Sequence, residues 1–174
     1  MTTRLPRLAC ALVLTAAAAT GCAGGGASDE PPATGDGEAG RVVRVVDGDT
    51  VIVALGAADE RVRLLGVDAP ESATPDRPVE CYGPQSAAEA ARLMPDGARV
   101  TLRFDPTQGR RDRFDRLLAE VTTATGTSTV NEQLVAGGFA EVFRGDGRGR
   151  LQPALRAAER EARDAVLGLW GACR

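Results

Sequence analysis

The sequence contains no histidine, and all 21 of its basic residues are arginine, because lysine is absent too. Without histidine, the chain cannot build a Ser-His-Asp or Cys-His centre, or a metal or haem site with imidazole ligands. Without lysine, it cannot form a Schiff base or a Walker-type phosphate loop. Hydrolysis remains open to carboxylates, arginines, a hard metal ion, or a Ser, Thr, Tyr or Cys nucleophile.

The chain also lacks the basic excess that is usual in proteins that bind polyanions nonspecifically. Its 24 acidic residues outnumber the arginines and give a formal net charge of −3. Removal of an N-terminal leader containing Arg4 and Arg7 would make the chain more acidic still. The distribution of charge can offset this balance, because six arginines crowd one stretch of the chain. They are Arg99, Arg103, Arg110, Arg111, Arg113 and Arg116.

The longest apolar run near the start, residues 8–19, has only about a dozen residues, too few to span a bilayer. It follows two arginines, as in a signal peptide. The Ala-Thr-Gly-Cys ending at residues 19–22 resembles a bacterial lipobox, which implies cleavage before Cys22 and attachment of lipid to that cysteine. We therefore expect a signal peptide at 1–21 and an extracytoplasmic protein that contacts the membrane through lipid on Cys22. A plain secreted protein is the alternative.

Residues 22–40 contain Gly, Ala, Pro and acids but no large apolar side chain, so we expect a flexible lipidated tether. The remaining residues, 41–174, are enough for one domain with a modest core, and we expect it to be a monomer. Once the first two cysteines are assigned to the leader and the lipid, Cys81 and Cys173 remain. In an oxidising compartment we predict a disulfide between them, with two unpaired thiols as the alternative.

Hydrophobic patterning predicts an α+β domain. We expect strands at 41–46, 50–55, 61–67, 99–104 and 116–122. Helices are expected from Gly83-Pro84 to just before Pro95, at 130–136 and at 151–169. Three strands, a helix, two strands and two further helices suit a closed five-stranded barrel of the OB type with three helices.

Two acidic clusters lie at strand ends. Asp49 follows the Asp-Gly turn of the first hairpin, and Asp68 follows the third expected strand. In a three-strand meander these ends meet, and two carboxylates with a backbone carbonyl suit a hard cation such as Ca²⁺. Glu71 could then act as a general base on a water. Taken alone, each cluster is more typical of a turn or a loop with a helix cap.

Two arginines could complete such a site. Arg63 lies on the third expected strand and Arg116 begins the fifth. Bidentate guanidinium donors stabilise the charged, five-coordinate phosphorus of a phosphodiester in hydrolysis. A single arginine on a strand is more often a solvated surface residue, so the interpretation depends on the joint order of these residues.

That joint order resembles the thermonuclease (staphylococcal nuclease) family. The resemblance extends over residues 41–170 and is carried by DGDTVIV, RLLGVDAPE, CYGPQSAAEA, DRFDR and VNEQLVAGGFA. It implies an OB barrel with three helices that uses Ca²⁺ to cleave DNA and RNA with little sequence preference. The implied metal ligands are Asp49, Asp68 and the carbonyl of Ala69; the implied base is Glu71; the phosphate-binding arginines are Arg63 and Arg116; and the substrate contacts are Arg113 and Phe114.

The sequence departs from the family pattern at several positions. Ala69 replaces a common Thr, Phe114 a Tyr, and Asp115 a Gly just before Arg116, where the aspartate could pair with that arginine or repel phosphate. Residues 143–150 lack the family's nucleotide-side tyrosines. These departures and the acidic charge favour an alternative, a catalytically inactive OB module that binds nucleic acid or protein at the cell surface. A purely structural lipoprotein is a third possibility.

Overall fold

The computed structural model describes residues 37–72, 78–145 and 149–173. The expected signal peptide, the lipidated Cys22 and most of the expected tether lie outside these residues, so they remain predictions. Within the described part, no helix has both the length and the apolar character needed to cross a membrane.

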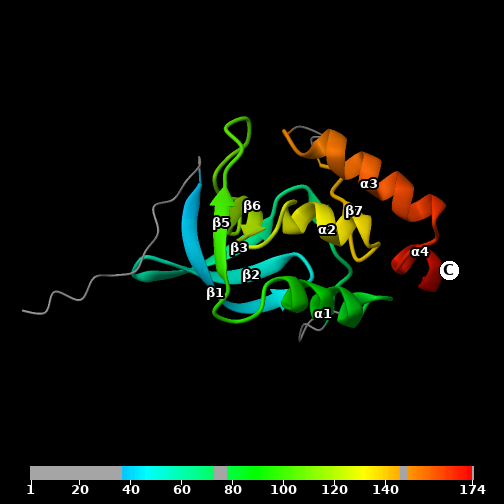
Figure 1. Cartoon of the computed structure of the whole chain (residues 1–174), viewed down its shortest axis with the longest axis horizontal. Coiled ribbons are helices and arrows are strands. Elements are labelled where there is room, and N and C mark those ends of the chain that lie inside the picture. Colours follow the sequence, from blue (N-terminus) through cyan, green and yellow to red (C-terminus); the bar gives the residue numbers. More distant parts are fainter. Residues whose placement is uncertain (1–36, 73–77, 146–148, 174) are drawn as a thin grey trace, which may run out of the picture. The chain divides into compact units, whose positions relative to one another are not determined.

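Five strands close into a barrel, which confirms the OB-type fold expected from the sequence (Figure 1). The order around the barrel is β1-β2-β3-β6-β5. Neighbouring strands are antiparallel except β3 and β6, which run parallel. The strands are β1 (Glu38–Asp47), β2 (Thr50–Leu55), β3 (Ala58–Leu64), β5 (Arg99–Arg103) and β6 (Leu117–Thr123).

Period-two alternation builds the barrel core. Val51 and Val53 of β2 are fully buried, whereas Ile52 between them is only half-buried. The same alternation places Val62 and Leu64 of β3 inside. Branched aliphatic side chains fill the interior because they pack well on a pleated surface. The other buried apolar residues of the barrel strands are Val42, Val100, Leu102, Leu117, Ala119 and Val121.

Several strand boundaries differ from the prediction. β1 begins at Glu38, so residues 38–40, which the sequence placed in the tether, pair with β5. Gly40 contributes because its backbone lies against β2, where an added Cβ would come within 2.6 Å of the Val53 side chain. The segment expected as one strand at 61–67 is broken by Gly66, whose φ is 77°.

After this break a second, two-stranded sheet forms from β4 (Val67–Asp68) and β7 (Glu141–Val142), which the sequence did not predict. The two strands are antiparallel, and Asp68 is the partner of Glu141. Phe143 extends the contact, because its backbone N–H donates to the Gly66 carbonyl at 2.9 Å. This short sheet therefore links the end of β3 to the chain that leads into the last helices.

The longer helices are α1 (Gly83–Leu93), α2 (Val130–Ala136) and α3 (Gln152–Asp164). In Figure 1 the yellow α2 lies between the green α1 and the orange α3, and it packs against both. Thr129 and Glu132 form a capping box at the start of α2. Its buried residue Asn131 bonds to two segments: Oδ1 accepts from the Val121 N–H at 3.0 Å, and Nδ2 donates to the carbonyls of Leu65 (2.9 Å) and Ala119 (3.3 Å).

The prediction of one continuous last helix at 151–169 was wrong. α3 ends at Asp164, and a separate four-residue α4 (Leu169–Ala172) follows. Val166 and Gly168 have φ values of 55° and 54°, outside the helical region. The break lets Leu169 donate its N–H to the Gly138 carbonyl at 2.8 Å. Tertiary contact with the end of α2 thus outweighs the local helical pattern.

The predicted disulfide is present in the structure. It joins Cys81, just before α1, to Cys173 after α4, which are 92 positions apart in the sequence and have a Cα–Cα distance of 5.8 Å. On the chain-entropy model, closing a loop of this size stabilises the fold by about 4 kcal/mol.

Asp105, in the loop after β5, is a second polar anchor. It is buried and accepts from the Thr107 hydroxyl at 2.6 Å, the Arg150 N–H at 2.7 Å and the Thr107 N–H at 2.8 Å. The Thr107 hydroxyl and the Arg150 N–H, which outweigh the effect of burial, lower the pKa of Asp105. The start of the last helical segment is thereby attached to the barrel.

Candidate functional site

Asp49 lies buried at the β1–β2 hairpin, where the sequence placed it. One carboxylate oxygen accepts from the Thr50 hydroxyl at 2.9 Å, and the other accepts from the Ala69 N–H at 2.9 Å. Asp47 caps the turn by accepting from the Gly48 N–H at 2.7 Å. The hairpin therefore fixes the Asp49 carboxylate and attaches it to the residue that follows β4.

Arg63 joins the two expected metal-binding carboxylates. From β3 it forms an ion pair with Asp49, and its Nη2 lies 3.0 Å from Oδ1 of Asp68. The side chains of Arg63 and Asp49 are 13% and 11% exposed, whereas that of Asp68 is 58% exposed. The structure thus brings these three predicted residues together, with one carboxylate buried and one facing solvent.

Burial raises the pKa of Asp49 above its usual range. The Arg63 charge and the hydrogen bonds from Ala69 and Thr50 act in the opposite direction and favour the carboxylate form. A buried carboxylate costs free energy to keep ionised unless a cation lies beside it, and Arg63 supplies that cation here.

A close backbone approach positions Ala69. A Cβ added to Gly48 would lie 2.6 Å from the Ala69 Cβ and 2.9 Å from the Ser86 Cβ, so only glycine fits at the hairpin turn. The available donors are the oxygens of Asp49 and Asp68 and the backbone carbonyl of Ala69. Hard oxygen donors of this kind fit Ca²⁺, with waters or phosphate completing its coordination. The set contains only two carboxylates, and within the residues described no group of three or more Asp, Glu, Cys or His side chains could hold a metal ion.

The backbone of Glu71 is held on two sides. Its N–H donates to a Glu80 carboxylate oxygen at 3.1 Å, and its carbonyl accepts from the Glu80 N–H at 2.9 Å. A Cβ added to Gly83, at the start of α1, would lie 2.1 Å from the Glu71 carbonyl oxygen. Glu80 and Gly83 therefore set the path of the chain at Glu71. The sequence analysis gave Glu80 no role and gave Gly83 only that of starting a helix.

Arg116 is held by Asp112, a residue to which the sequence assigned no role. The Nε and Nη2 of Arg116 both lie 2.7 Å from Asp112 Oδ2. The other carboxylate oxygen, Oδ1, accepts from the N–H groups of Phe114 (2.9 Å) and Arg116 (3.0 Å). Burial opposes ionisation, but the bonds from Arg116 and Phe114 outweigh it and lower the pKa of Asp112. Asp112 thus closes the 112–116 turn and orients the arginine.

The substitution of Asp115 for glycine has a visible consequence. Asp115 has a φ of 62°, in the left-handed region that glycine adopts freely and aspartate tolerates. It does not pair with Arg116. Its carboxylate lies 3.5 Å from Nε of Arg111, which also donates to the Asp115 carbonyl at 2.7 Å. Among the described residues, the ion-pair partner of Arg116 is Asp112 alone.

Phe114 is exposed at the tip of this turn, with 63% of its surface accessible. The guanidinium carbons of Arg113 and Arg116 lie 4.7 Å and 5.5 Å from the centre of its ring. The two predicted substrate-contacting residues, Arg113 and Phe114, therefore present a cation beside an accessible aromatic face.

Strand pairing relates the two arginines. Because β3 and β6 are parallel, with Arg63 the partner of Leu118, Arg116 lies two residues before that partner, directly ahead of β6 rather than at its start as predicted. The positions of the two arginines alternate with inward-facing Val62, Leu64 and Leu117, so both arginines emerge on the outer face. From strand spacing and rise, their Cα atoms are about 8 Å apart. One face thus carries two carboxylate-held guanidinium groups.

Comparison with known proteins gives matches over the same region. The family described as "Staphylococcal nuclease homologue" matches residues 61–172. A thermonuclease from Staphylococcus intermedius is 34% identical over 134 residues, 77% of each chain. A thermonuclease from Staphylococcus hyicus is 31% identical over 130 residues, 75% of this chain and 74% of that one. A protein described as an uncharacterized endonuclease, from Escherichia coli O157:H7, is 35% identical over 131 residues, 75% of this chain and 76% of that one.

Proposed function

Since this chain belongs to the family of staphylococcal nuclease homologues and is a nuclease, we propose that it is a Ca²⁺-dependent enzyme that hydrolyses the phosphodiester bonds of DNA and RNA with little sequence preference. One observation carries the proposal: Arg63 gathers Asp49 and Asp68 at one end of the barrel, on the face that also carries Arg116. Relatives named thermonuclease and endonuclease favour an enzyme over the inactive binding module.

The carboxylates of Asp49 and Asp68 and the carbonyl of Ala69 would hold the Ca²⁺. The bound ion would supply positive charge to a phosphate oxygen and to a water. The burial of Asp49 supports this assignment, because a buried carboxylate gains more from a nearby cation than an exposed one does.

Glu71 is the proposed general base, and in a chain without histidine a carboxylate suits that role. The water oxygen bonds to phosphorus as Glu71 takes up the proton. The bond from phosphorus to one sugar oxygen breaks, and that oxygen takes up a proton from solvent as it leaves, while the proton on Glu71 returns to solvent. Arg63 and Arg116 donate to the non-bridging oxygens, where negative charge accumulates in the transition state. Arg113 and Phe114 contact the adjacent nucleotide.

Cleavage of plasmid and single-stranded DNA and of RNA, with Ca²⁺ and then with EGTA, tests this function. We expect cleavage only with Ca²⁺, and losses of at least a hundredfold in kcat for Glu71→Gln and Arg116→Ala. Glu89→Gln on α1 is the matched control for Glu71→Gln, because Glu89 pairs only with the exposed Arg92 among the described residues. Undiminished cleavage by both site variants would refute the assignment.

We further propose that the enzyme acts outside the cytoplasm, tethered by lipid on Cys22 or released as a secreted protein. The support is the order of the N-terminal sequence alone: two arginines, a short apolar run and Ala-Thr-Gly-Cys. Labelling of expressing cells with a fatty-acid analogue should mark the wild type and leave Cys22→Ser unlabelled. Equal labelling of both proteins would exclude lipidation at this cysteine.

A further inference from the structure

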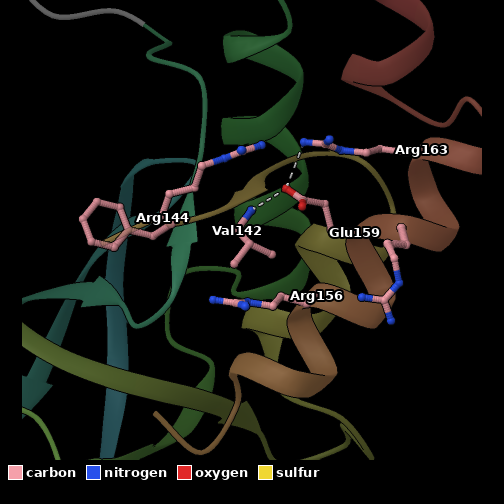
Figure 2. Close-up of a pocket in the computed structure, with 7 residues that line it drawn as sticks. Val142, Arg144, Arg156, Glu159 and Arg163 are labelled. Carbon is pink, nitrogen blue, oxygen red and sulfur yellow. Dashed lines mark hydrogen bonds and ion pairs between the residues drawn. The ribbon is translucent and has the colours of Figure 1, made fainter. Parts of the chain in front are cut away.

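A pocket of about 350 Å³ lies between the end of β7 and α3, apart from the proposed catalytic residues. Figure 2 shows Arg144 and Arg163 extending towards Glu159 from opposite sides, with Arg156 entering the same space from α3. Four arginines and one carboxylate line the pocket, an unusual concentration of positive charge in an acidic chain. Its lining residues are Val142, Phe143, Arg144, Arg156, Glu159, Arg160 and Arg163.

The single carboxylate of the lining is already engaged. Glu159 accepts from the Val142 N–H at 3.0 Å and lies 3.4 Å from Nη2 of Arg163, which also stacks 4.0 Å from the centre of the Trp170 ring. In contrast, Arg156 and Arg160 are exposed and form no ion pair with any residue that the structure describes. These two guanidinium groups have donors available for an anion.

The pocket adjoins the proposed site through the small sheet. Asp68 of β4 is the partner of Glu141 of β7, and Arg144 follows three residues later. A strand spacing of about 5 Å and a chain of three residues place the Arg144 Cα within about 15 Å of the Asp68 Cα. This is the length of about four stacked nucleotides of one strand.

We propose that this pocket binds phosphates of the substrate strand a few nucleotides from the cleaved bond. This inference rests on the proposed nuclease function. Guanidinium groups donate bidentately to phosphate oxygens, and Phe143, 50% exposed at the pocket, offers a ring on which a base can stack. A basic groove with an accessible aromatic ring suits a single strand, whose bases are free to stack.

The first test measures binding alone, with fluorescent oligonucleotides in EGTA so that no cleavage is expected. Arg156→Gln with Arg160→Gln should weaken binding of a twelve-nucleotide single strand about three- to tenfold. It should also reduce the slope of log affinity against log salt by about 0.7 for each lost phosphate contact. The charge-matched control is Arg41→Gln with Arg92→Gln, at exposed positions on β1 and α1, and should change neither quantity as much.

The second test is the dependence of kcat/KM on substrate length. The wild type should prefer the twelve-nucleotide strand to a dinucleotide, and the pocket variant should lose that preference while keeping its kcat on the dinucleotide. Phe143→Ala should lose part of it. A variant with the wild-type length preference and salt slope overturns the inference. Loss of binding to phosphatidylserine vesicles without loss of oligonucleotide binding also overturns it, in favour of a membrane contact.

These readouts separate the two proposals. A wild-type protein that cleaves nothing, yet binds the long strand through Arg156 and Arg160, refutes the nuclease mechanism and leaves the pocket assignment intact. A protein that cleaves with Ca²⁺, but whose pocket variant binds every oligonucleotide like the wild type, retains the mechanism and excludes the subsite.

Discussion

Replacement of Asn131 by alanine should destabilise the domain more than any change at an exposed position of the same helix. Asn131 is fully buried and bonds to backbone groups of β6 and of the turn before β4. Truncation leaves the Val121 N–H and the Leu65 carbonyl without this partner. The Ala119 carbonyl keeps the Leu65 N–H at 2.9 Å, so it is not orphaned.

The magnitude follows from those two groups. Each buried backbone group left without its partner costs about 1–3 kcal/mol, so we expect a loss of about 3 kcal/mol in the free energy of unfolding. For a domain of this size, this corresponds to a fall in Tm of about 10 °C. Activity should fall too, because the Leu65 turn leads into the strand that carries Asp68.

Urea unfolding followed by fluorescence of Trp170, the only tryptophan, measures the effect with the disulfide intact. Gln133→Ala is the matched control on α2, since its amide makes a single bond of 3.2 Å to the Ser128 carbonyl, and its loss should cost less than about 1 kcal/mol. If Asn131→Ala lowers the free energy of unfolding no more than the control does, the Asn131 hydrogen bonds do not stabilise the contact between the barrel and the turn before β4, and the expected magnitude is refuted.

Three further outcomes follow from the site and its supports. Gly83→Ala places a methyl group 2.1 Å from the Glu71 carbonyl oxygen and should shift the backbone at Glu71, so steady-state kinetics should show at least a tenfold lower kcat. A kcat within twofold of the wild-type value would contradict this expectation. Asp112→Asn keeps an oxygen for the turn but loses the charge that holds Arg116, so kcat should fall ten- to a hundredfold, with a smaller loss of Tm than in Asp112→Ala. The pKa of Asp105 is lowered in the fold, so the stability that its ionised carboxylate contributes is present above the unfolded-state pKa of about 4 and is lost as pH falls through the folded-state value. The free energy of urea unfolding of Asp105→Asn should therefore depend less on pH between about 5 and 2 than that of the wild type.

Local patterns predicted the barrel because each pattern determines its own element. The alternation in β2 and β5 and the Asp47-Gly48 turn depend on residues within a few positions of each other. The meeting of Asp49 and Asp68 followed from meander topology alone, and Arg63 lies between them in the structure. The catalytic and metal-binding roles assigned to these residues remain predictions.

The features that the sequence did not predict depend on distant contacts. The pairing of β4 with β7 joins two-residue strands more than 70 positions apart, too short for any periodic signal. The break after α3 lets the Leu169 N–H donate to the carbonyl of Gly138, which lies about 30 positions earlier in the sequence. The role of Asp112 could have been predicted, because an aspartate four residues before an arginine in a turn can accept both from the backbone and from the guanidinium.

Two kinds of arginine follow from this arrangement, and they predict different kinetic roles. Arg63 and Arg116 are held by carboxylates and are partly shielded, with 13% and 24% of their side-chain surface exposed. A guanidinium fixed in this way loses little entropy when it meets a transition state, so its removal should act mainly on kcat. Arg156 and Arg160 are exposed and lack an ion-pair partner in the described part of the chain, so they gain only weak, salt-sensitive contacts that any bound strand can make. Their removal should act on KM, because contacts made equally in the ground and transition states do not raise kcat.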